Sequence, residues 1–301
     1  MNLIVTGASG IIGKAFVELY SSEHSITALT RKIEPNFDNR IQWVETDYTV
    51  ASLSKAFFGI DAVIHMAGIR FSPPFEESFT HYIDNITVSD NIFRACASMG
   101  IKKIVCASSR GVYSVSNEIP WKESDTAAPE NFYGVSKLMM ETMASLYSKK
   151  FNINIKCLRI AQILSADERK GYLLRTLFDL AKIKGTPTIS GTGGEGREYI
   201  YVKDAARSFL YAVLYGEHSG VYNIGTGYVI SIKDLAKLIN RVFDNPLLIR
   251  YSDRPENLSK SLMDCSKAER ELNFKAAFSI ERAIKDIFDD WKRSISKDFD
   301  G

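Results

Sequence analysis

A glycine-rich segment near the N-terminus, Thr6-Gly7-Ala8-Ser9-Gly10-Ile11-Ile12-Gly13, constrains the fold more than any other part of the 301-residue chain. It follows a short apolar run and precedes a helical pattern from Ile11 to Tyr20. Because glycine has no Cβ, Gly7 can form a tight turn, Gly10 permits close backbone approach, and Gly13 lets a helix pack on a strand. The helix N-terminus presents unpaired N–H groups and a partial positive charge. The segment therefore predicts a strand, a turn that binds a pyrophosphate, and a helix.

Short apolar runs alternate with amphipathic stretches along the first half of the chain. The runs typical of strands are 3–5, 25–29, 41–44, 61–65, 103–107 and 154–158. The stretches with helical spacing are 11–20, 52–58, 82–98 and 133–149. Strands that alternate with helices form βαβ units, and therefore a parallel sheet. Together with the glycine-rich segment, this order predicts an α/β fold: a doubly wound parallel sheet of the Rossmann type that binds a dinucleotide.

The pattern loosens after residue 164, so we expect a domain boundary there. Residues 1–164 form the predicted dinucleotide-binding Rossmann domain, completed by parts of 198–228. Residues 165–301 mainly form a smaller C-terminal α/β domain that binds the substrate. Helices are expected in it at 205–215, after Ser231 and at 280–291.

The charge of the chain is nearly balanced, with 38 Lys and Arg against 36 Asp and Glu. A net charge of +2 produces no strong field toward nucleic acids or acidic membranes. No apolar run approaches the roughly 20 residues that span a bilayer, and the N-terminus lacks the pattern of a signal peptide. The cysteines and histidines show no metal-site spacing. We therefore expect a soluble cytoplasmic protein with no metal and no nucleic-acid or membrane partner.

The residues at the end of the second strand bear on which dinucleotide fits. An NAD site usually has Asp or Glu there, bound to the ribose 2′-hydroxyl. This chain has Thr30-Arg31-Lys32 instead, and no acid before Glu34. Because two cations suit a 2′-phosphate better than a hydroxyl, the segment favours NADP. The alternative is a solvent-exposed pair of cations, which leaves NAD as the cofactor.

A tyrosine and a lysine four residues apart, Tyr133 and Lys137, lie on one face of the helix expected at 133–149. A phenol transfers protons poorly at neutral pH because its reference pKa is about 10, and a nearby ammonium group favours its ionised form. Ser109 follows the strand expected at 103–107, at the sheet edge where open α/β folds bind ligands. These three residues predict a site where Tyr133 transfers a proton and Ser109 steadies a substrate oxygen.

Several separate motifs together resemble the extended short-chain dehydrogenase/reductase family, in its NAD-dependent nucleotide-sugar epimerase/dehydratase branch. Residues 6–13 match the TGxxGxxG loop, His65-Met66-Ala67-Gly68 resembles the HxAA/G strand end, and Tyr133 with Lys137 matches YxxxK. The resemblance covers nearly the whole chain. It implies that Tyr133 is the general acid/base, Ser109 orients the substrate oxygen, and Lys137 holds the nicotinamide ribose and tunes Tyr133.

The same resemblance implies which residues bind the cofactor. Asp47 matches the residue that bonds the adenine amino group, and Asn85 matches a helix residue near the cofactor. The implied cofactor-binding residues are Gly7, Gly10, Ile11, Ile12, Gly13, Thr30, Arg31, Lys32, Asp47, Tyr48, Met66, Ala67, Gly68, Asn85, Tyr133 and Lys137. The resemblance also implies a homodimer formed by the two helices with the Asn and Tyr-Lys motifs. Apolar residues in 83–93 and 138–146 permit it, and core packing explains them equally well.

Two arginines in the second half match segments that bind the substrate in this family. Arg197 lies in a segment similar to GxRxxxxVxD, and Arg254 begins one similar to RPGD. The resemblance implies that both arginines contact a diphosphate, and a guanidinium is the preferred bidentate partner of phosphate. The implied substrate is a nucleotide sugar, bound by Ser109, Arg197 and Arg254.

The chain also departs from this family. Arg110 and Gly111 stand where the dehydratases have an Asp-Glu pair, so we do not expect dehydration. Gln162 replaces the usual Asn of the LRxxNVYGP segment, which leaves the identity of the substrate open. Hydride transfer at a sugar carbon, which the resemblance places at C4, is then compatible with an epimerase or with an NADPH-dependent 4-keto-sugar reductase.

Two further functions stay open. A non-catalytic sensor could bind NADP and a protein partner, but it would have no need for Tyr133 and Lys137 beside Ser109. A carbonyl reductase or lactone-forming enzyme could act on a substrate without a nucleotide. Arg197 and Arg254 would then be structural.

Overall fold

The computed structural model describes residues 1–34, 37–70, 78–253 and 259–299. Its strands are β1 (Asn2–Thr6), β2 (Ser25–Thr30), β3 (Gln42–Glu45), β4 (Ala62–His65), β5 (Lys103–Ser109), β6 (Asn154–Ile160), β7 (Gln162–Leu164), β8 (Thr188–Ser190), β9 (Gly196–Tyr201), β10 (Gly220–Ile224), β11 (Val229–Ser231) and β12 (Arg250–Ser252). Its α-helices are α1 (Ile11–Tyr20), α2 (Val50–Ala56), α3 (Ile83–Met99), α4 (Phe132–Phe151), α5 (Leu173–Lys182), α6 (Val202–Leu214), α7 (Ile232–Val242), α8 (Ser266–Leu272) and α9 (Ile280–Phe299). Two short 3-10 helices are η1 (Phe79–Tyr82) and η2 (Arg110–Val112). Every strand and helix expected before residue 164 is present, with ends that differ by a few residues.

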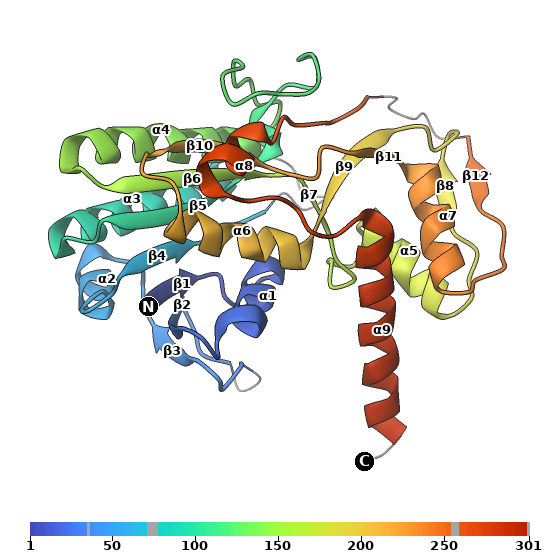
Figure 1. The fold of residues 1–301 in the computed structure, drawn as a ribbon, viewed down its shortest axis with the longest axis horizontal. Helices are drawn as coiled ribbons and strands as arrows, with labels where there is room; N and C mark the ends of the chain where they lie inside the picture. Colours follow the sequence, from blue (N-terminus) through green and yellow to red (C-terminus); the bar gives the residue numbers. More distant parts are fainter. Residues whose placement is uncertain (35–36, 71–77, 254–258, 300–301) are drawn as a thin grey trace.

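The main sheet is parallel throughout the described residues, in the order β10-β6-β5-β4-β1-β2-β3 (Figure 1). The chain runs outward from β1 through β2 and β3, and then returns past β1 to β4, β5 and β6. This reversal is the topological switch point of a doubly wound sheet, where ligands bind. The predicted fold class is therefore confirmed. Strand β10 comes from the second half of the chain and adds the last strand beside β6.

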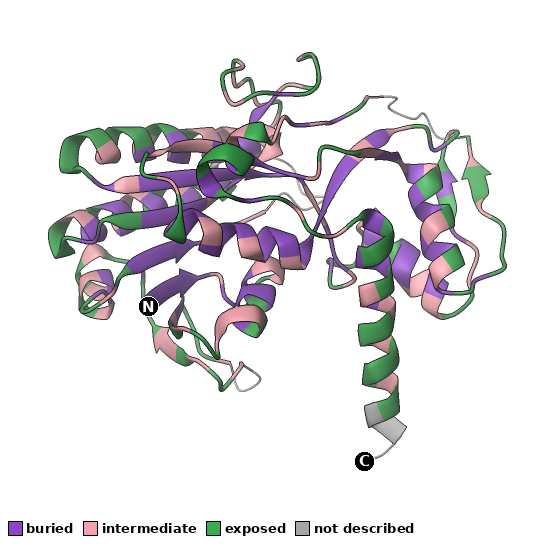
Figure 2. Ribbon diagram, in the orientation of Figure 1, coloured by how far each residue is buried: buried purple, intermediate pink, exposed green. Residues whose placement is uncertain are grey.

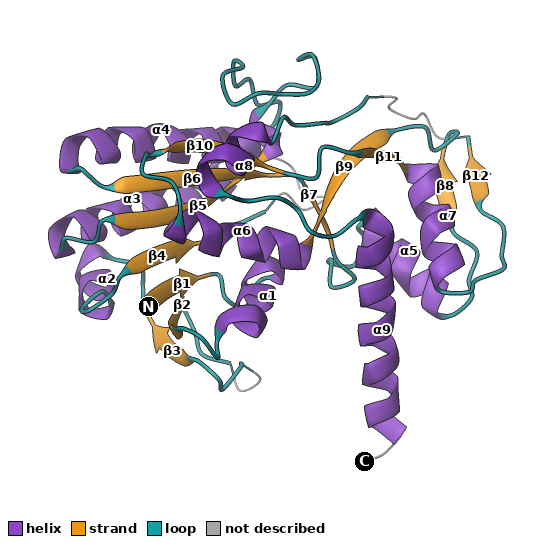
Figure 3. Ribbon diagram, in the orientation of Figure 1, coloured by secondary structure: helices purple, strands orange, loops and turns teal. Residues whose placement is uncertain are grey.

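The two faces of the sheet bury two separate apolar cores, because successive side chains on a strand point to opposite faces. Leu3 and Val5 pack on one face with α1 and α6, whereas Ile4 packs on the other with α2, α3 and α4. All four residues of β4 are buried, as expected for a parallel strand covered on both sides. Figure 2 shows the strands as the most continuously buried part of the chain, and Figure 3 shows the helices that cover them.

The strand register places the carboxyl ends of four neighbouring strands along one edge of the sheet. Thr6 of β1 pairs with His65 of β4, and His65 pairs with Cys106 of β5. Ser109, at the end of β5, pairs with Ile160 at the end of β6. The glycine-rich segment, the strand end at His65 and the Ser109 hydroxyl are therefore neighbours in space, although they are far apart in sequence.

The second half of the chain adds two small sheets and several helices to one side of the main sheet (Figure 1). Strands β11, β9 and β7 form one small sheet, and β12 pairs with β8. Helix α5 was not expected from the sequence. The three-residue strands were not expected either, because strands of this length are too short to show an alternation of apolar and polar residues. Helix α9 projects from the body and ends at the described C-terminus. In the described part of the chain, no helix is both long and apolar enough to cross a membrane.

Candidate active site

A cleft of ≈ 930 Å³ lies at the carboxyl edge of the main sheet. It is lined by the glycine-rich segment, the ends of β4, β5 and β6, the start of α4, and residues 160–172. Most of the predicted site residues line it together: Gly7, Gly10, Ile11, Ile12, Gly13, Thr30, Arg31, Tyr48, Met66, Ala67, Gly68, Asn85, Ser109, Tyr133 and Lys137. Lys32, Asp47 and Arg197 do not line it. Arg254 lies outside the described residues.

The glycine-rich segment packs too tightly for side chains at two of its positions. Gly7 has a φ of +74°, and a Cβ there would lie 2.7 Å from the backbone nitrogen of Ala67. A Cβ on Gly13 would lie 2.2 Å from the carbonyl oxygen of Gly7. Helix α1 begins at Ile11, its N-cap residue Gly10 provides no side-chain cap, and its first turn contains no acid. The positive end of this helix is thus available to an anion at the cleft, which fits the pyrophosphate of a dinucleotide.

A buried histidine joins the glycine-rich segment to β4 and α3. Nδ1 of His65 accepts a hydrogen bond from the Thr6 hydroxyl at 2.8 Å, and Nε2 donates to Ser89 Oγ at 3.1 Å. This tautomer follows from the partners, because Thr6 Oγ1 already accepts from Ala67 N and Ser89 donates to Asn85 O. Burial, together with the Lys137 charge, lowers the pKa of His65 to about 3. The ring is therefore neutral and structural.

Asn85 fixes the backbone that follows β4. Its Oδ1 accepts from the backbone N–H of Ile69 at 2.7 Å, and its Nδ2 donates to the Ile69 carbonyl at 2.9 Å. A Cβ on Gly68 would lie 3.3 Å from Asn85 Oδ1 and 3.4 Å from Lys137 Nζ. The segment is thus held against α3 and α4, which keeps this wall of the cleft in place.

The cations expected at the ribose end of the cofactor each have an acidic partner. Arg31 Nη2 lies 3.0 Å from Asp84 Oδ2, and its guanidinium lies 5.9 Å from the centre of the Tyr48 ring. Lys32 Nζ lies 3.2 Å from a carboxylate oxygen of Glu34. Both pairs are largely exposed, so each contributes little to stability.

Asp47 lies near this end of the site, but its carboxylate accepts hydrogen bonds from a neighbouring residue of the same loop. Oδ1 accepts hydrogen bonds from the backbone N–H and the hydroxyl of Thr49, at 2.9 and 2.8 Å. These hydrogen bonds lower the pKa of the Asp47 carboxyl. The neighbouring Tyr48 does line the cleft, and its hydroxyl donates to the carbonyl of Leu29 at 3.0 Å.

The Ser109, Tyr133 and Lys137 side chains meet at the cleft where η2 packs on α4. Ser109 Oγ accepts from the backbone N–H of Gly111 at 3.0 Å, which leaves its own hydrogen free to donate. Lys137 Nζ donates to the carbonyl of Ala107 at 2.9 Å and lies 5.8 Å from the centre of the Tyr133 ring. A Cβ on Gly134 would lie 2.2 Å from the carbonyl oxygen of Gly111, so a glycine is required for this close approach.

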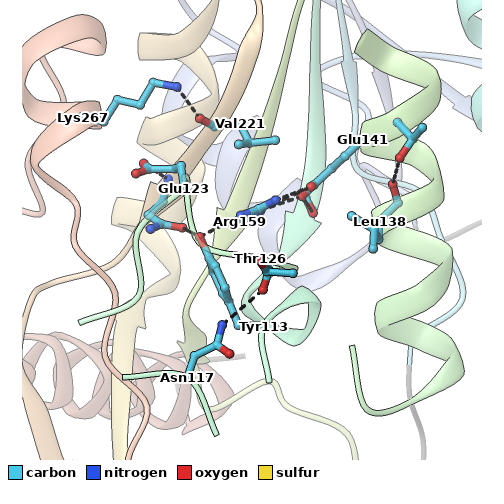
Figure 4. Close-up of polar contacts among 12 residues, drawn as sticks. Tyr113, Asn117, Glu123, Thr126, Leu138, Glu141, Arg159, Val221 and Lys267 are labelled. Carbon is cyan, nitrogen blue, oxygen red and sulfur yellow. Dashed lines mark hydrogen bonds and ion pairs between the residues drawn. The ribbon is translucent and has the colours of Figure 1, made fainter. Parts of the chain in front are cut away.

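A buried polar network ties α4 to β5 and β6 just behind these residues (Figure 4). The guanidinium of Arg159 binds both carboxylate oxygens of Glu141, with Nη2 to Oε2 at 2.7 Å, and donates to the Tyr113 hydroxyl at 2.8 Å. Ser108 donates to Glu141 Oε1 at 2.5 Å. Tyr113 in turn donates to Asn223 Oδ1 of β10 at 2.8 Å.

The positive and negative charges of this network, on Arg159 and Glu141, are paired with each other. Burial disfavours the Arg159 cation, but the hydrogen bonds and ion pair with Glu141 outweigh burial and raise the pKa of the guanidinium. Burial raises the pKa of Tyr113 to about 12, so its phenol stays protonated and can donate. The network therefore holds the middle of α4 and the ends of β5 and β6 in a single arrangement.

Three arginines that were not expected in the site, Arg70, Arg110 and Arg169, line the cleft beside the predicted residues. Arg70 Nη2 lies 2.6 Å from Oε1 of Glu168, whose side chain is 3% exposed. The Arg70 guanidinium also lies 5.7 Å from the centre of the Tyr172 ring. Arg110, the first residue of η2, lies between Ser109 and Gly111. For two of them, the position in the sequence could have indicated that they lie in the site, since Arg110 directly follows Ser109 and Arg70 lies two residues after Gly68.

Arg197 lies outside the cleft and is already paired. Its Nε donates to Glu195 Oε1 at 2.8 Å, and its Nη2 donates to Glu195 Oε2 at 3.0 Å. This fork-to-fork pair is the bidentate geometry expected of an arginine with a phosphate, but it is made here with a carboxylate of the same chain. Across the described residues, no three His, Cys, Asp or Glu side chains gather in a way that could hold a metal ion.

Several known proteins are similar to this chain over most of its length. A UDP-N-acetylglucosamine 4-epimerase from Bacillus cereus has a similar structure, with 31% identity, a TM-score of 0.86, and coverage of 95% of this chain and 98% of that chain. A UDP-glucose 4-epimerase from Bacillus subtilis is 27% identical, over 95% of both chains. A dTDP-4-dehydro-6-deoxyglucose reductase from Escherichia coli is 24% identical, over 95% of this chain and 97% of its own. The model of the NAD dependent epimerase/dehydratase family matches residues 3–225. The chain belongs to this family.

Proposed function

We propose that this protein is an NAD-dependent epimerase that moves a hydride at C4 of a nucleotide sugar. The observation that carries the proposal is the meeting of Ser109, Tyr133 and Lys137 in one cleft with an uncapped helix N-terminus. The Bacillus relatives, a UDP-N-acetylglucosamine and a UDP-glucose 4-epimerase by name, support C4 as the reacting carbon and a UDP sugar as the substrate.

In this mechanism, Tyr133 is the group that moves the proton. Its phenol oxygen takes the proton of the C4 hydroxyl as the carbon–hydrogen bond breaks, and returns it when the hydride comes back to the other face of the sugar. Ser109 donates its free hydrogen to the same substrate oxygen. Lys137, held by the Ala107 carbonyl, places a positive charge 5.8 Å from the centre of the Tyr133 ring. When bound, NAD supplies the hydride acceptor.

The cofactor side of the cleft fits NAD. We propose that the N-terminus of α1 holds the pyrophosphate, and that the Met66–Gly68 segment with Lys137 holds the nicotinamide ribose. NAD is one of the two cofactors that the sequence left open, and the family is NAD dependent by description. Arg31 and Lys32 are each paired with an acid, so a 2′-phosphate would have to compete with Asp84 and Glu34.

The preference between cofactors is measurable by calorimetric titration. We expect NAD to bind at least as tightly as NADP. Replacing Arg31 with alanine is expected to weaken NADP more than NAD, because only NADP carries the 2′-phosphate that Arg31 could reach. An NADP affinity ten times higher than that of NAD in the unaltered protein would show that the 2′-phosphate displaces Asp84.

The alternative function is a reductase of a 4-keto sugar, which the similarity to the Escherichia coli reductase favours. The two functions differ in what they consume. An epimerase converts UDP-glucose or UDP-N-acetylglucosamine to its C4 epimer without net consumption of a reduced cofactor. A reductase oxidises one NADPH or NADH per 4-keto sugar. Product analysis by chromatography, with and without reduced cofactor, separates the two functions. If neither reaction proceeds on any nucleotide sugar, the proposal is wrong.

We also propose that the two halves of the chain bind different ligands and that the protein is a homodimer. Residues 1–164, with parts of 198–228, would hold the cofactor, and residues 165–301 would mainly hold the substrate. The dimer would form through α3 and α4, where Ile83, Met139 and Leu146 are exposed. Ile92 and Phe93 of α3 are fully buried in the core and cannot take part in such an interface.

A further inference from the structure

Arg110 is a cation without a protein partner in the cleft. It lines the cleft immediately after Ser109 and is only partly exposed to solvent. None of the described residues accepts a hydrogen bond or forms an ion pair with its guanidinium, whereas Arg70 and Arg31 in the same cleft each have a carboxylate within 3.0 Å. A cation removed from water without a partner destabilises the protein unless an anion arrives to pair with it.

Two acidic side chains, Glu195 just before β9 and Glu198 on β9, accept hydrogen bonds from groups other than Arg110. Glu195 is taken up by the bidentate pair with Arg197. Oε1 of Glu198 accepts from the backbone N–H groups of Thr226 and Gly227, both at 2.8 Å, and Oε2 accepts from that of Met263 at 2.9 Å. Burial, followed by the positive charge of Arg197, lowers the pKa of the Arg110 guanidinium. Tyr199, Glu195 and Glu198 act on the guanidinium in the opposite direction, but burial and Arg197 outweigh them.

We propose that Arg110, rather than Arg197, is the guanidinium that binds an oxyanion of the substrate in this cleft. The inference rests on the proposed function and assigns to Arg110 the role that the family pattern implied for Arg197. A guanidinium offers five N–H donors in a planar fork, which suits either a phosphate of the diphosphate or a carboxylate on the sugar. Both are oxyanions, and Arg110 directly follows Ser109, whose hydroxyl is proposed to bind the sugar oxygen.

The local backbone supports an approach of the substrate to Arg110. Gly111 follows it, and a Cβ at that position would lie 3.3 Å from Ser109 Oγ and 3.9 Å from Cδ1 of Tyr133. The absence of a side chain there keeps open the space between Ser109 and Tyr133, beside Arg110 in the chain. A guanidinium does not lose its proton at physiological pH, so Arg110 acts as a fixed charge and not as an acid or base.

The test compares Arg110→Gln with Arg197→Gln, the same change at the arginine that the family pattern favours. Arg94→Gln is the background control, since Arg94 is exposed on α3 and outside the cleft. The full-length protein, saturated with NAD, is titrated with UDP, UDP-glucose and UDP-glucuronic acid in a calorimeter. Circular dichroism and NAD affinity verify that each variant is folded.

We expect Arg110→Gln to weaken binding of the anion at least tenfold and Arg197→Gln to weaken it less. Equal weakening of all three ligands identifies the diphosphate as the anion, whereas selective weakening of UDP-glucuronic acid identifies a sugar carboxylate. Arg110→Lys, which keeps the charge but loses the fork, should fall between the unaltered protein and Arg110→Gln, and it substitutes for Arg110→Gln if that variant does not fold.

Affinities of a folded Arg110→Gln variant within twofold of the unaltered protein for all three ligands would overturn the inference. A larger loss in Arg197→Gln than in Arg110→Gln would overturn it as well, and would leave the proposed function intact. If the unaltered protein binds none of the three ligands and no other nucleotide sugar, the proposed function fails, and the inference fails with it.

Discussion

At the scale of single residues, the cleft combines groups of three kinds. Tyr133, Lys137 and Ser109 offer a proton, a fixed charge and a hydrogen-bond donor. His65 is neutral and structural, because both of its nitrogens are used. Arg110 is a charge without a described partner. Residue type alone does not separate these roles; the hydrogen-bond partners do.

The proton-transfer role of Tyr133 predicts the effect of removing its hydroxyl. Tyr133→Phe should lower kcat by roughly 10²- to 10⁴-fold, the usual contribution of a general acid or base. NAD affinity should change less than threefold, since the ring remains and Lys137 keeps its bond to Ala107. Steady-state kinetics and NAD titration measure the two quantities. Unchanged kcat in the variant would exclude Tyr133 as the acid/base.

The buried His65 predicts a pH dependence of stability. In the unfolded chain a histidine gains its proton below about pH 6.5, whereas in the folded protein its pKa is lowered to about 3. The unfolded state therefore binds more protons between these values, and the free energy of unfolding falls as the pH decreases through this window. The contribution of one such group is about 1.4 kcal/mol per pH unit.

Urea unfolding between pH 6 and pH 4 tests this prediction. As the pH decreases, the free energy of unfolding of His65→Gln should fall less steeply than that of the unaltered protein, by about 1.4 kcal/mol per pH unit. This difference in slope does not depend on the stability of the variant at pH 7. His218→Gln, which changes an exposed histidine, is the matched control and should keep the original slope. Identical slopes for His65→Gln and the unaltered protein would contradict the buried, neutral ring.

At the scale of elements, helix α4 organises the site. Tyr133, Lys137 and Glu141 recur every four residues and therefore share one face. The helix begins at Asn131, whose Oδ1 accepts from the Gly134 N–H at 2.8 Å. Tyr133 and Lys137 line the cleft, Lys137 also donates to the Ala107 carbonyl, and Glu141 is paired with Arg159. The spacing indicated a shared face, but the partner of Glu141 came from β6.

The Glu141–Arg159 pair predicts a large loss of stability when one partner is neutralised. Both side chains are about 95% buried, so Glu141→Gln leaves a buried cation and should cost about 3–5 kcal/mol of unfolding free energy. Glu281→Gln removes a carboxylate from the exposed pair with Arg241 and should cost less than about 1 kcal/mol. Urea denaturation at pH 7 measures both. Equal costs would show that the buried pair is not the anchor of α4.

At the scale of the whole molecule, the second half of the chain completes the first. Strand β10 pairs with β6, and Asn223 of β10 reaches the Tyr113 hydroxyl behind the cleft. The side chain of Asn223 also donates to the carbonyls of Trp121 and Asp264, at 2.9 and 3.1 Å. The segment between β5 and β6 and the segment after β12 are thus tied to the same strand.

The proposed homodimer is tested at this scale. Leu146 of α4 is 63% exposed, and Met139 lies two turns earlier on the same face. Leu146→Asp would place a charge in an apolar interface and should shift the protein from dimer to monomer in light scattering. Leu248→Asp changes an equally apolar, exposed leucine far from α4 in sequence and should have no effect. A monomeric unaltered protein would exclude the dimer.

The sequence alone determined the order of strands and helices before residue 164, the doubly wound sheet and the family. These follow from local rules: a period of two in strands, a turn that needs glycines, and four-residue spacing on a helix. Only the tertiary structure decided which charged side chains line the cleft and which of them are paired with an acid. Arg31 pairs with Asp84 and Arg70 with Glu168, across 53 and 98 residues. Arg197 pairs with Glu195 and does not line the cleft, whereas Arg110 does. Long charged side chains are placed by distant partners, and no local pattern in a sequence contains that information.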